Sequence, residues 1–138
     1  MKKLLILPLF TGIIFAQSLK AKEYAIVASK DFTKPSVSQI KALYLKKSDY
    51  VGDTKVIPLN LSAKNKIRRS FEKKVLHMSF NRLKSYWTKQ HYLGHRPPIT
   101  MKSQKSIQAF IKKVDGAIGY VELPNVDPKL QIIYKWSD

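Results

Sequence analysis

The sequence of 138 residues contains no cysteine. Disulfide scaffolds, thiolate zinc sites, thiol nucleophiles and lipoprotein anchors all require cysteine, so these classes are excluded. A chain without disulfides must rely on its hydrophobic core. The hydrophobic fraction of 44% is typical of one globular domain with a modest core.

Acidic residues are scarce, with nine Asp and Glu against 26 Lys and Arg, for a net charge of +17. No two acids have a spacing typical of general acid–base catalysis, and no G-x-S-x-G motif is present, so we do not expect an enzyme. A field this positive attracts phosphate, lipid head groups, polysaccharide or nucleic acid without selecting among them.

Histidine is also rare, and only His91 and His95 stand at a helical i,i+4 spacing. Gly94 lies between them and is expected to end the helix, so we interpret both as solvated surface residues. No metal and no cofactor are expected.

Long apolar runs are absent apart from Leu4–Ala16, which follows the basic start Met1-Lys2-Lys3. A membrane span needs ~20 residues, so this run predicts a secretory signal peptide, with an uncleaved anchor as the alternative. Cleavage after Ala16, Ser18 or Ala21 fits the small residues there. We therefore predict a signal peptide over 1–21, a domain over 22–138 and a periplasmic location.

The remaining chain alternates strand and helix patterns. Strands are predicted at Tyr24–Ser29, Lys55–Leu61, Ala117–Glu122 and Leu130–Tyr134. Helices are predicted after Ser36 (in a capping box with Gln39), through Ile67, Phe71 and Val75, from Ser79 to Gly94, and from Ser103 to Gly116. This order predicts an α/β domain with a central mixed sheet flanked by helices.

Three single residues or groups carry local expectations. Pro58 suggests an edge or a bulge in its strand, and Gly119 suggests close packing. The aromatic residues at helix and strand spacing are interpreted as core rather than as stacking platforms, so no specific nucleic-acid ligand is expected.

The start of the second predicted helix is unusually basic. Lys64, Lys66, Arg68 and Arg69 precede its first acid, Glu72. A positive charge near the positive end of the helix dipole destabilises the helix by ~0.3–1 kcal/mol unless an anion or solvent screens it. Ligands of open α/β sheets bind beyond the carboxyl ends of strands, where helices begin, so this start is either an oxyanion site or a solvated helix end in a lysine-rich chain.

Several short motifs follow one another along the chain. In chain order they are Ser38–Ile40 with Leu43–Lys46, Val56–Leu61 (VIPLNL), Arg68–Phe71 (RRSF), Val75-Leu76, Tyr86-Trp87, Gly94–Pro98 and Gly116–Val121 (GAIGYV). Together this ordered set resembles the phosphate-binding proteins of bacterial phosphate ABC transporters, especially their short single-domain relatives. Gly116–Val121 is the most specific of the motifs.

The resemblance implies a periplasmic-binding-protein-like fold of type II topology, with an oxyanion held by hydroxyls, helix N-termini and an arginine. On this chain it carries Arg68 over directly as a site residue, Asn65 as a substituted position and Ser62 as a neighbour that can compensate. Ser29, at the end of the first strand, and Ser103, at the start of the last helix, are site candidates by their place in the topology, with ordinary helix or turn caps as the alternative. Asn65 stands where the short relatives often have serine, and Asn65-Lys66-Ile67 replaces the S-G-T of the larger ones. The residues of 22–138 amount to about one lobe of a two-lobed receptor.

The function implied by the resemblance is binding of phosphate or a similar oxyanion, with an ABC permease or a sensor as partner. The alternative is a basic periplasmic module that binds polyanions or a protein partner and has no small-molecule ligand. Peripheral contact with a membrane surface is compatible with either reading.

Overall fold

The computed structural model describes residues 3–6, 8, 12–13 and 20–138. The predicted signal peptide and its cleavage site lie largely outside these residues. The strands are β1 (Glu23–Ala28), β2 (Tyr50–Val51), β3 (Thr54–Lys55), β4 (Ile57–Asn60), β5 (Ile99–Thr100), β6 (Ala117–Glu122) and β7 (Gln131–Ser137). The helices are α1 (Val37–Tyr44), α2 (Lys66–Lys74), α3 (Phe80–Tyr92), α4 (Gln104–Lys113) and the short 3-10 helix η1 (Leu123–Asn125).

Five strands form the central sheet in the order β5-β4-β6-β1-β7, and β2 and β3 form a separate hairpin. Strand β4 is parallel to both β5 and β6, whereas β1 is antiparallel to β6 and β7. The sheet is therefore mixed, as predicted. The direction of β1 decides which residues can share a site.

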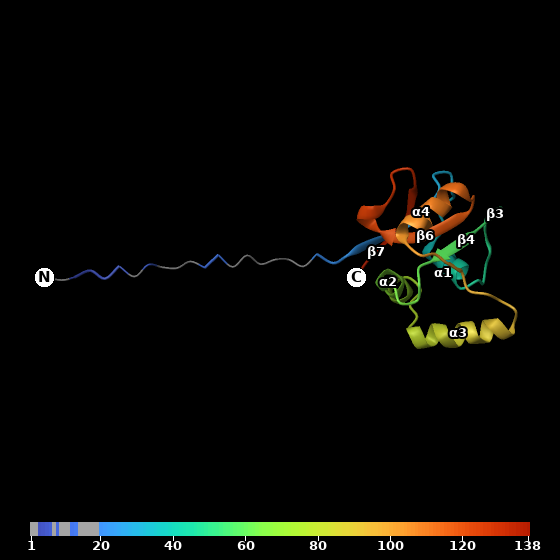
Figure 1. Cartoon of the computed structure of the whole chain (residues 1–138), viewed down its shortest axis with the longest axis horizontal. Helices are drawn as coiled ribbons and strands as arrows, with labels where there is room; N and C mark the ends of the chain where they lie inside the picture. The colour runs from blue at the N-terminus through green and yellow to red at the C-terminus, as the bar shows by residue number, and fades with distance from the viewer. Residues whose placement is uncertain (1–2, 7, 9–11, 14–19) are drawn as a thin grey trace.

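Helices cover both faces of the sheet (Figure 1), with α4 on one side and α1 and α2 on the other. On the α4 side, Gly119 lies so close to the helix that an added Cβ would come within 2.4 Å of Ile107 Cγ2, which confirms the expected packing role. On the other side α3 forms an outer layer, attached in part by a hydrogen bond of 2.7 Å from the Tyr86 hydroxyl to the Leu45 carbonyl.

Four aromatic rings form the core beneath α2. The Phe71 ring stacks on Tyr120 with centroids 4.3 Å apart, meets Tyr44 at 4.6 Å and Trp136 at 5.6 Å. All four side chains are buried. These rings hold the start of α2 against the sheet and do not form an exposed stacking platform.

Side chains cap the starts of the helices. Ser36 and Gln39 form the predicted capping box, Ser103 caps α4, and Ser79, the predicted start of α3, caps that helix. By its place in the sequence, either Ser62 or Asn65 could cap α2, and in the structure Asn65 caps it. Gly94 follows α3 with φ of 82°, a left-handed conformation that suits glycine at a helix end.

The predicted strand over Lys55–Leu61 is wrong at its start, because Lys55 belongs to the hairpin of β2 and β3 and β4 begins at Ile57. Gly52, with φ of 58°, forms the tight turn of that hairpin, which the sequence analysis missed. Strand β4 is not an edge strand, but β5 pairs only with Leu59 and Asn60. Pro58 itself therefore has no partner in β5. The predicted edge position is correct for this residue, which is unpaired on one side, but wrong for β4 as a whole, which lies between β5 and β6.

Candidate functional site

The start of α2 lies beyond the carboxyl end of β4. After β4 the chain turns at Ala63-Lys64, and the Ser62 carbonyl accepts a hydrogen bond of 2.9 Å from the Asn65 N–H. Asn65 Oδ1 then accepts from the Ile67 N–H at 2.8 Å and caps the helix. We call Ser62, Asn65 and Arg68 the α2 edge.

Arg68 is partly used within the protein. One Nη donates a hydrogen bond of 2.9 Å to the Leu61 carbonyl, and Nε lies 3.4 Å from a carboxylate oxygen of Glu72. Both side chains are mostly buried, with 15% of Arg68 and 12% of Glu72 exposed. The arginine therefore fixes the β4–α2 connection, and its remaining N–H donors are left for a ligand or water.

Glu72 is the residue that the sequence analysis did not connect to this site. Burial raises the pKa of its carboxyl, and the ion pair with Arg68 acts in the opposite direction. Its position four residues after Arg68 on one helix is the signal that could have found it. The Glu72 carboxylate neutralises the charge of Arg68, so a bound anion must also be attracted by other cations.

Those other cations are exposed on and beside the first turn of α2. Lys64, Lys66 and Arg69 are all solvent-exposed, and the first turn of α2 contains no acid. Beside Arg68, a cavity of about 240 Å³ opens between α2 and α3, lined by Ala63, Arg68, Glu72, Phe80, Leu83, Lys84 and Trp87. An oxyanion at this edge would meet a positive surface with one neutralised pair.

A buried polar network supports the α2 edge from below. The Tyr120 hydroxyl donates to Asn60 Oδ1 at 2.7 Å and accepts from the Leu61 N–H at 3.1 Å. Burial is the main cause that raises the pKa of Tyr120, so this hydroxyl stays protonated and remains a donor. The Tyr44 hydroxyl bonds the Leu59 carbonyl at 3.0 Å. The network satisfies buried polar groups of β4 and orders the carbonyl that Arg68 contacts.

Ser103 lies on the same edge of the sheet, because it follows β5, the parallel neighbour of β4. Its hydroxyl is already engaged in the cap of α4, accepting from the Ser106 N–H at 3.1 Å and lying 3.0 Å from the Ser106 hydroxyl.

Ser29 is not brought to this edge. Strand β1 runs antiparallel to β6, so its start pairs with Glu122 and its end, Ala28, pairs with Ile118 near the beginning of β6. Ser29 therefore follows β1 at the opposite edge, where its hydroxyl donates to Asp31 Oδ1 at 2.8 Å. The structure thus groups Ser62, Asn65, Arg68 and Ser103 on one edge and separates Ser29 from them.

Within the part of the chain that the structure describes, no helix is both long enough and apolar enough to cross a bilayer. The same part holds no cluster of three or more His, Cys, Asp or Glu suited to a metal ion.

No family model and no curated protein sequence matches this chain. Solved structures that are similar in fold include two phosphate-transport proteins. One is an ABC-type phosphate transport receptor from Vibrio cholerae, with a TM-score of 0.64 and 16% identity over 82% of this chain and 46% of the receptor. The other, from Clostridium perfringens, is described as a phosphate ABC transporter substrate-binding protein with bound phosphate. It has a TM-score of 0.65 and 16% identity over 82% of this chain and 45% of its own.

These similarities confirm the fold that the motifs implied, a periplasmic-binding-protein-like α/β domain. The chain spans about half the length of the two neighbours.

Proposed function

We propose that the chain is an exported solute-binding-like protein that binds phosphate or a similar oxyanion at the α2 edge, without catalysing a reaction. The observation that carries the proposal is the acid-free, basic start of α2 at the carboxyl end of β4. Two phosphate-receptor structures with this fold support it. A permease or a sensor is the partner class that such a role implies.

The ligand would lie on an open edge. Exposed Lys64 and Lys66 supply charge, and Ser62 and the unused Arg68 donors supply hydrogen bonds. Hydrogen-bonded anion recognition of this kind is less sensitive to salt than binding by counterion release.

Asn65→Asp offers a clean test, since aspartate caps a helix as well as asparagine does. The new negative charge interacts favourably with the positive end of the helix dipole but repels an oxyanion. We expect phosphate, titrated calorimetrically at ~150 mM salt with sulfate as competitor, to bind the wild type saturably. Asn65→Asp should lose that binding while its melting temperature stays equal or rises.

Ser79→Asp is the matched control, because it places the same charge at the cap of α3. It should bind phosphate as the wild type does. A wild type that gives no saturable heat, or an Asn65→Asp variant that binds normally, would refute the α2-edge proposal.

A second candidate function is polyanion binding, favoured by one feature of the charge distribution. From Lys73 to Val114 the chain has ten Lys and Arg and no acid, and this stretch includes α3, β5 and α4. Dextran sulfate is a suitable probe. Its affinity should fall steeply between ~50 and ~200 mM salt if many surface cations bind it together, whereas phosphate binding at the α2 edge should change little.

A further inference from the structure

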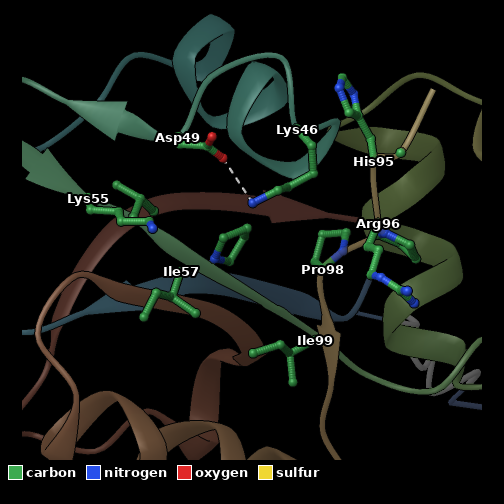
Figure 2. A pocket seen from close by; sticks show the side chains of 12 residues that line it. Lys46, Asp49, Lys55, Ile57, His95, Arg96, Pro98 and Ile99 are labelled. Carbon is green, nitrogen blue, oxygen red and sulfur yellow. Dashed lines mark ion pairs between the residues drawn. The ribbon is translucent and has the colours of Figure 1, made fainter. Parts of the chain in front are cut away.

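A second basic hollow lies at the other end of β4. It has a volume of about 480 Å³ and runs between the segment Lys55–Pro58 on one side and Gly94–Ile99 on the other. Figure 2 shows Lys55 on one wall and Arg96 on the opposite wall, with Pro98 and Ile57 between them. We call this feature the β4 hollow.

The hollow exists because β5 is short. Proline cannot donate a strand hydrogen bond, and Pro97-Pro98 directly precede Ile99, where β5 begins. Strand β5 therefore pairs with Leu59 and Asn60 only, and Ile57 and Pro58 have no neighbour on that side. The space that a longer β5 would fill remains open, and Pro58 and Pro98 are buried in its floor.

The charges of the β4 hollow are unbalanced. Its acid, Asp49, is paired with Lys46 at 2.9 Å, and the hydrogen bond from that lysine is the main cause that lowers the pKa of Asp49. Across the described part of the chain, neither Lys55 nor Arg96 takes part in an ion pair. Both are exposed, so the walls present two free cations with a neutralised pair beside them.

The floor is apolar. Ile57 is half-buried, the two prolines are buried, and Ile99 leaves 51% of its surface exposed at the rim. A bare inorganic ion would leave this apolar surface in water. A ligand that carries both an anion and an apolar group would cover it while meeting the cations.

We propose that the β4 hollow binds a small organic phosphate, a phosphate monoester that carries an apolar or aromatic group. The Arg96 guanidinium can donate two parallel hydrogen bonds to the phosphate, and Lys55 on the opposite wall adds positive charge. The apolar group packs on Pro58, Pro98 and Ile99. The volume falls in the range of ~300–1,000 Å³ that is usual for small-molecule sites.

This site is independent of the α2 edge. The hollow adjoins the amino end of β4, and the α2 edge follows its carboxyl end. Asn65→Asp should therefore leave the β4 hollow unchanged.

The test is a titration of isotope-labelled protein with phenyl phosphate, monitored by two-dimensional NMR. Inorganic phosphate and phenol are the comparison ligands. Phenyl phosphate should shift the amide signals of Lys55, Arg96 and Ile99 saturably. Its dissociation constant should be lower than that of either comparison ligand. Absence of saturable shifts at these residues, or equal binding of inorganic phosphate there, would overturn the proposal.

The variant Lys55→Gln/Arg96→Gln changes two exposed side chains and should weaken phenyl phosphate by about tenfold or more. Lys30→Gln/Lys135→Gln, which removes the same charge from exposed positions elsewhere, should bind as the wild type does. Ile99→Ser should weaken phenyl phosphate but leave phosphate binding at the α2 edge intact. Equal loss in both double variants would show that net charge alone binds the probe and would refute a defined site.

Discussion

The two ends of β4 carry similar charge and use it differently. At the carboxyl end, Arg68 is mostly buried, paired with Glu72 and bonded to the Leu61 carbonyl above an aromatic core. At the amino end, Lys55 and Arg96 are exposed and stand over a floor of proline and isoleucine. At the carboxyl end the main cation therefore stabilises the fold through contacts within the protein. At the amino end, in the described part of the chain, neither cation takes part in an ion pair.

The largest expected difference between the ends concerns packing. Phe71→Ala should lower the free energy of unfolding by about 3–5 kcal/mol, because it leaves a cavity among the buried rings of Tyr44, Tyr120 and Trp136. Ile99→Ala at the rim of the β4 hollow should change it by less than about 1 kcal/mol. Urea unfolding measures both, and equal losses would show that the hollow is part of the core.

The second difference concerns the ion pair. Arg68→Ala should cost about 2–4 kcal/mol, because it leaves the Glu72 carboxylate and the Leu61 carbonyl without their partner. The double variant Arg68→Ala/Glu72→Ala should cost less than Arg68→Ala alone, since no orphan carboxylate remains.

Arg96→Ala is the control at the amino end, and its effect should stay within about 0.5 kcal/mol. The same denaturation series measures all three variants. An Arg68→Ala protein as stable as the wild type would mean that the pair contributes nothing to the fold.

The third difference is in pH dependence, and the two ends have opposite signs. The pKa of Glu72 is raised, chiefly by burial, so its favourable contribution is full below the ordinary value of 4.5 and is lost as pH rises through the raised value. The pKa of Asp49 is lowered by Lys46, so its contribution is present above the ordinary value of 3.8 and is lost as pH falls through the lowered value.

Melting temperatures between about pH 3 and 7 of the wild type, Glu72→Gln and Asp49→Asn test this. Glutamine resembles the protonated carboxyl, so the wild type and Glu72→Gln should melt at similar temperatures at low pH, and the wild type should fall relative to Glu72→Gln as pH rises. The wild type should rise relative to Asp49→Asn toward neutral pH. Two differences that move in the same direction would contradict the assignment of opposite environments.

The smallest expected effect is on the α2 cap. Asn65→Asp should raise the free energy of unfolding by about 0.3–1 kcal/mol at low salt, because a negative charge at a helix start is favourable and position 65 stands between Lys64 and Lys66 in the sequence. The gain should shrink as salt rises. A loss of stability would indicate that the cap geometry of Asn65 requires its amide.

The sequence by itself determined the elements whose signals are local. The capping box of Ser36 and Gln39, the caps Ser79 and Ser103, the end of α3 at Gly94 and the strand over Ala117–Glu122 depend on residues close together in the chain. The ordered motifs also pointed to the fold that the two solved structures share. For the same reason, Asn65 and Arg68 were found as neighbours at one helix start.

Only the tertiary structure decided which residues meet across the chain. Ser29 was grouped with the α2 edge because it follows a strand, but the direction of β1 depends on pairing with β6 and β7 at the far end of the sequence. The partner carbonyl of Arg68, the Tyr120–Asn60 hydrogen bond and the space beside Pro58 depend likewise on packing between distant segments. Strand pairing and burial are set by contacts summed over the whole domain, and no local pattern of residues contains that sum.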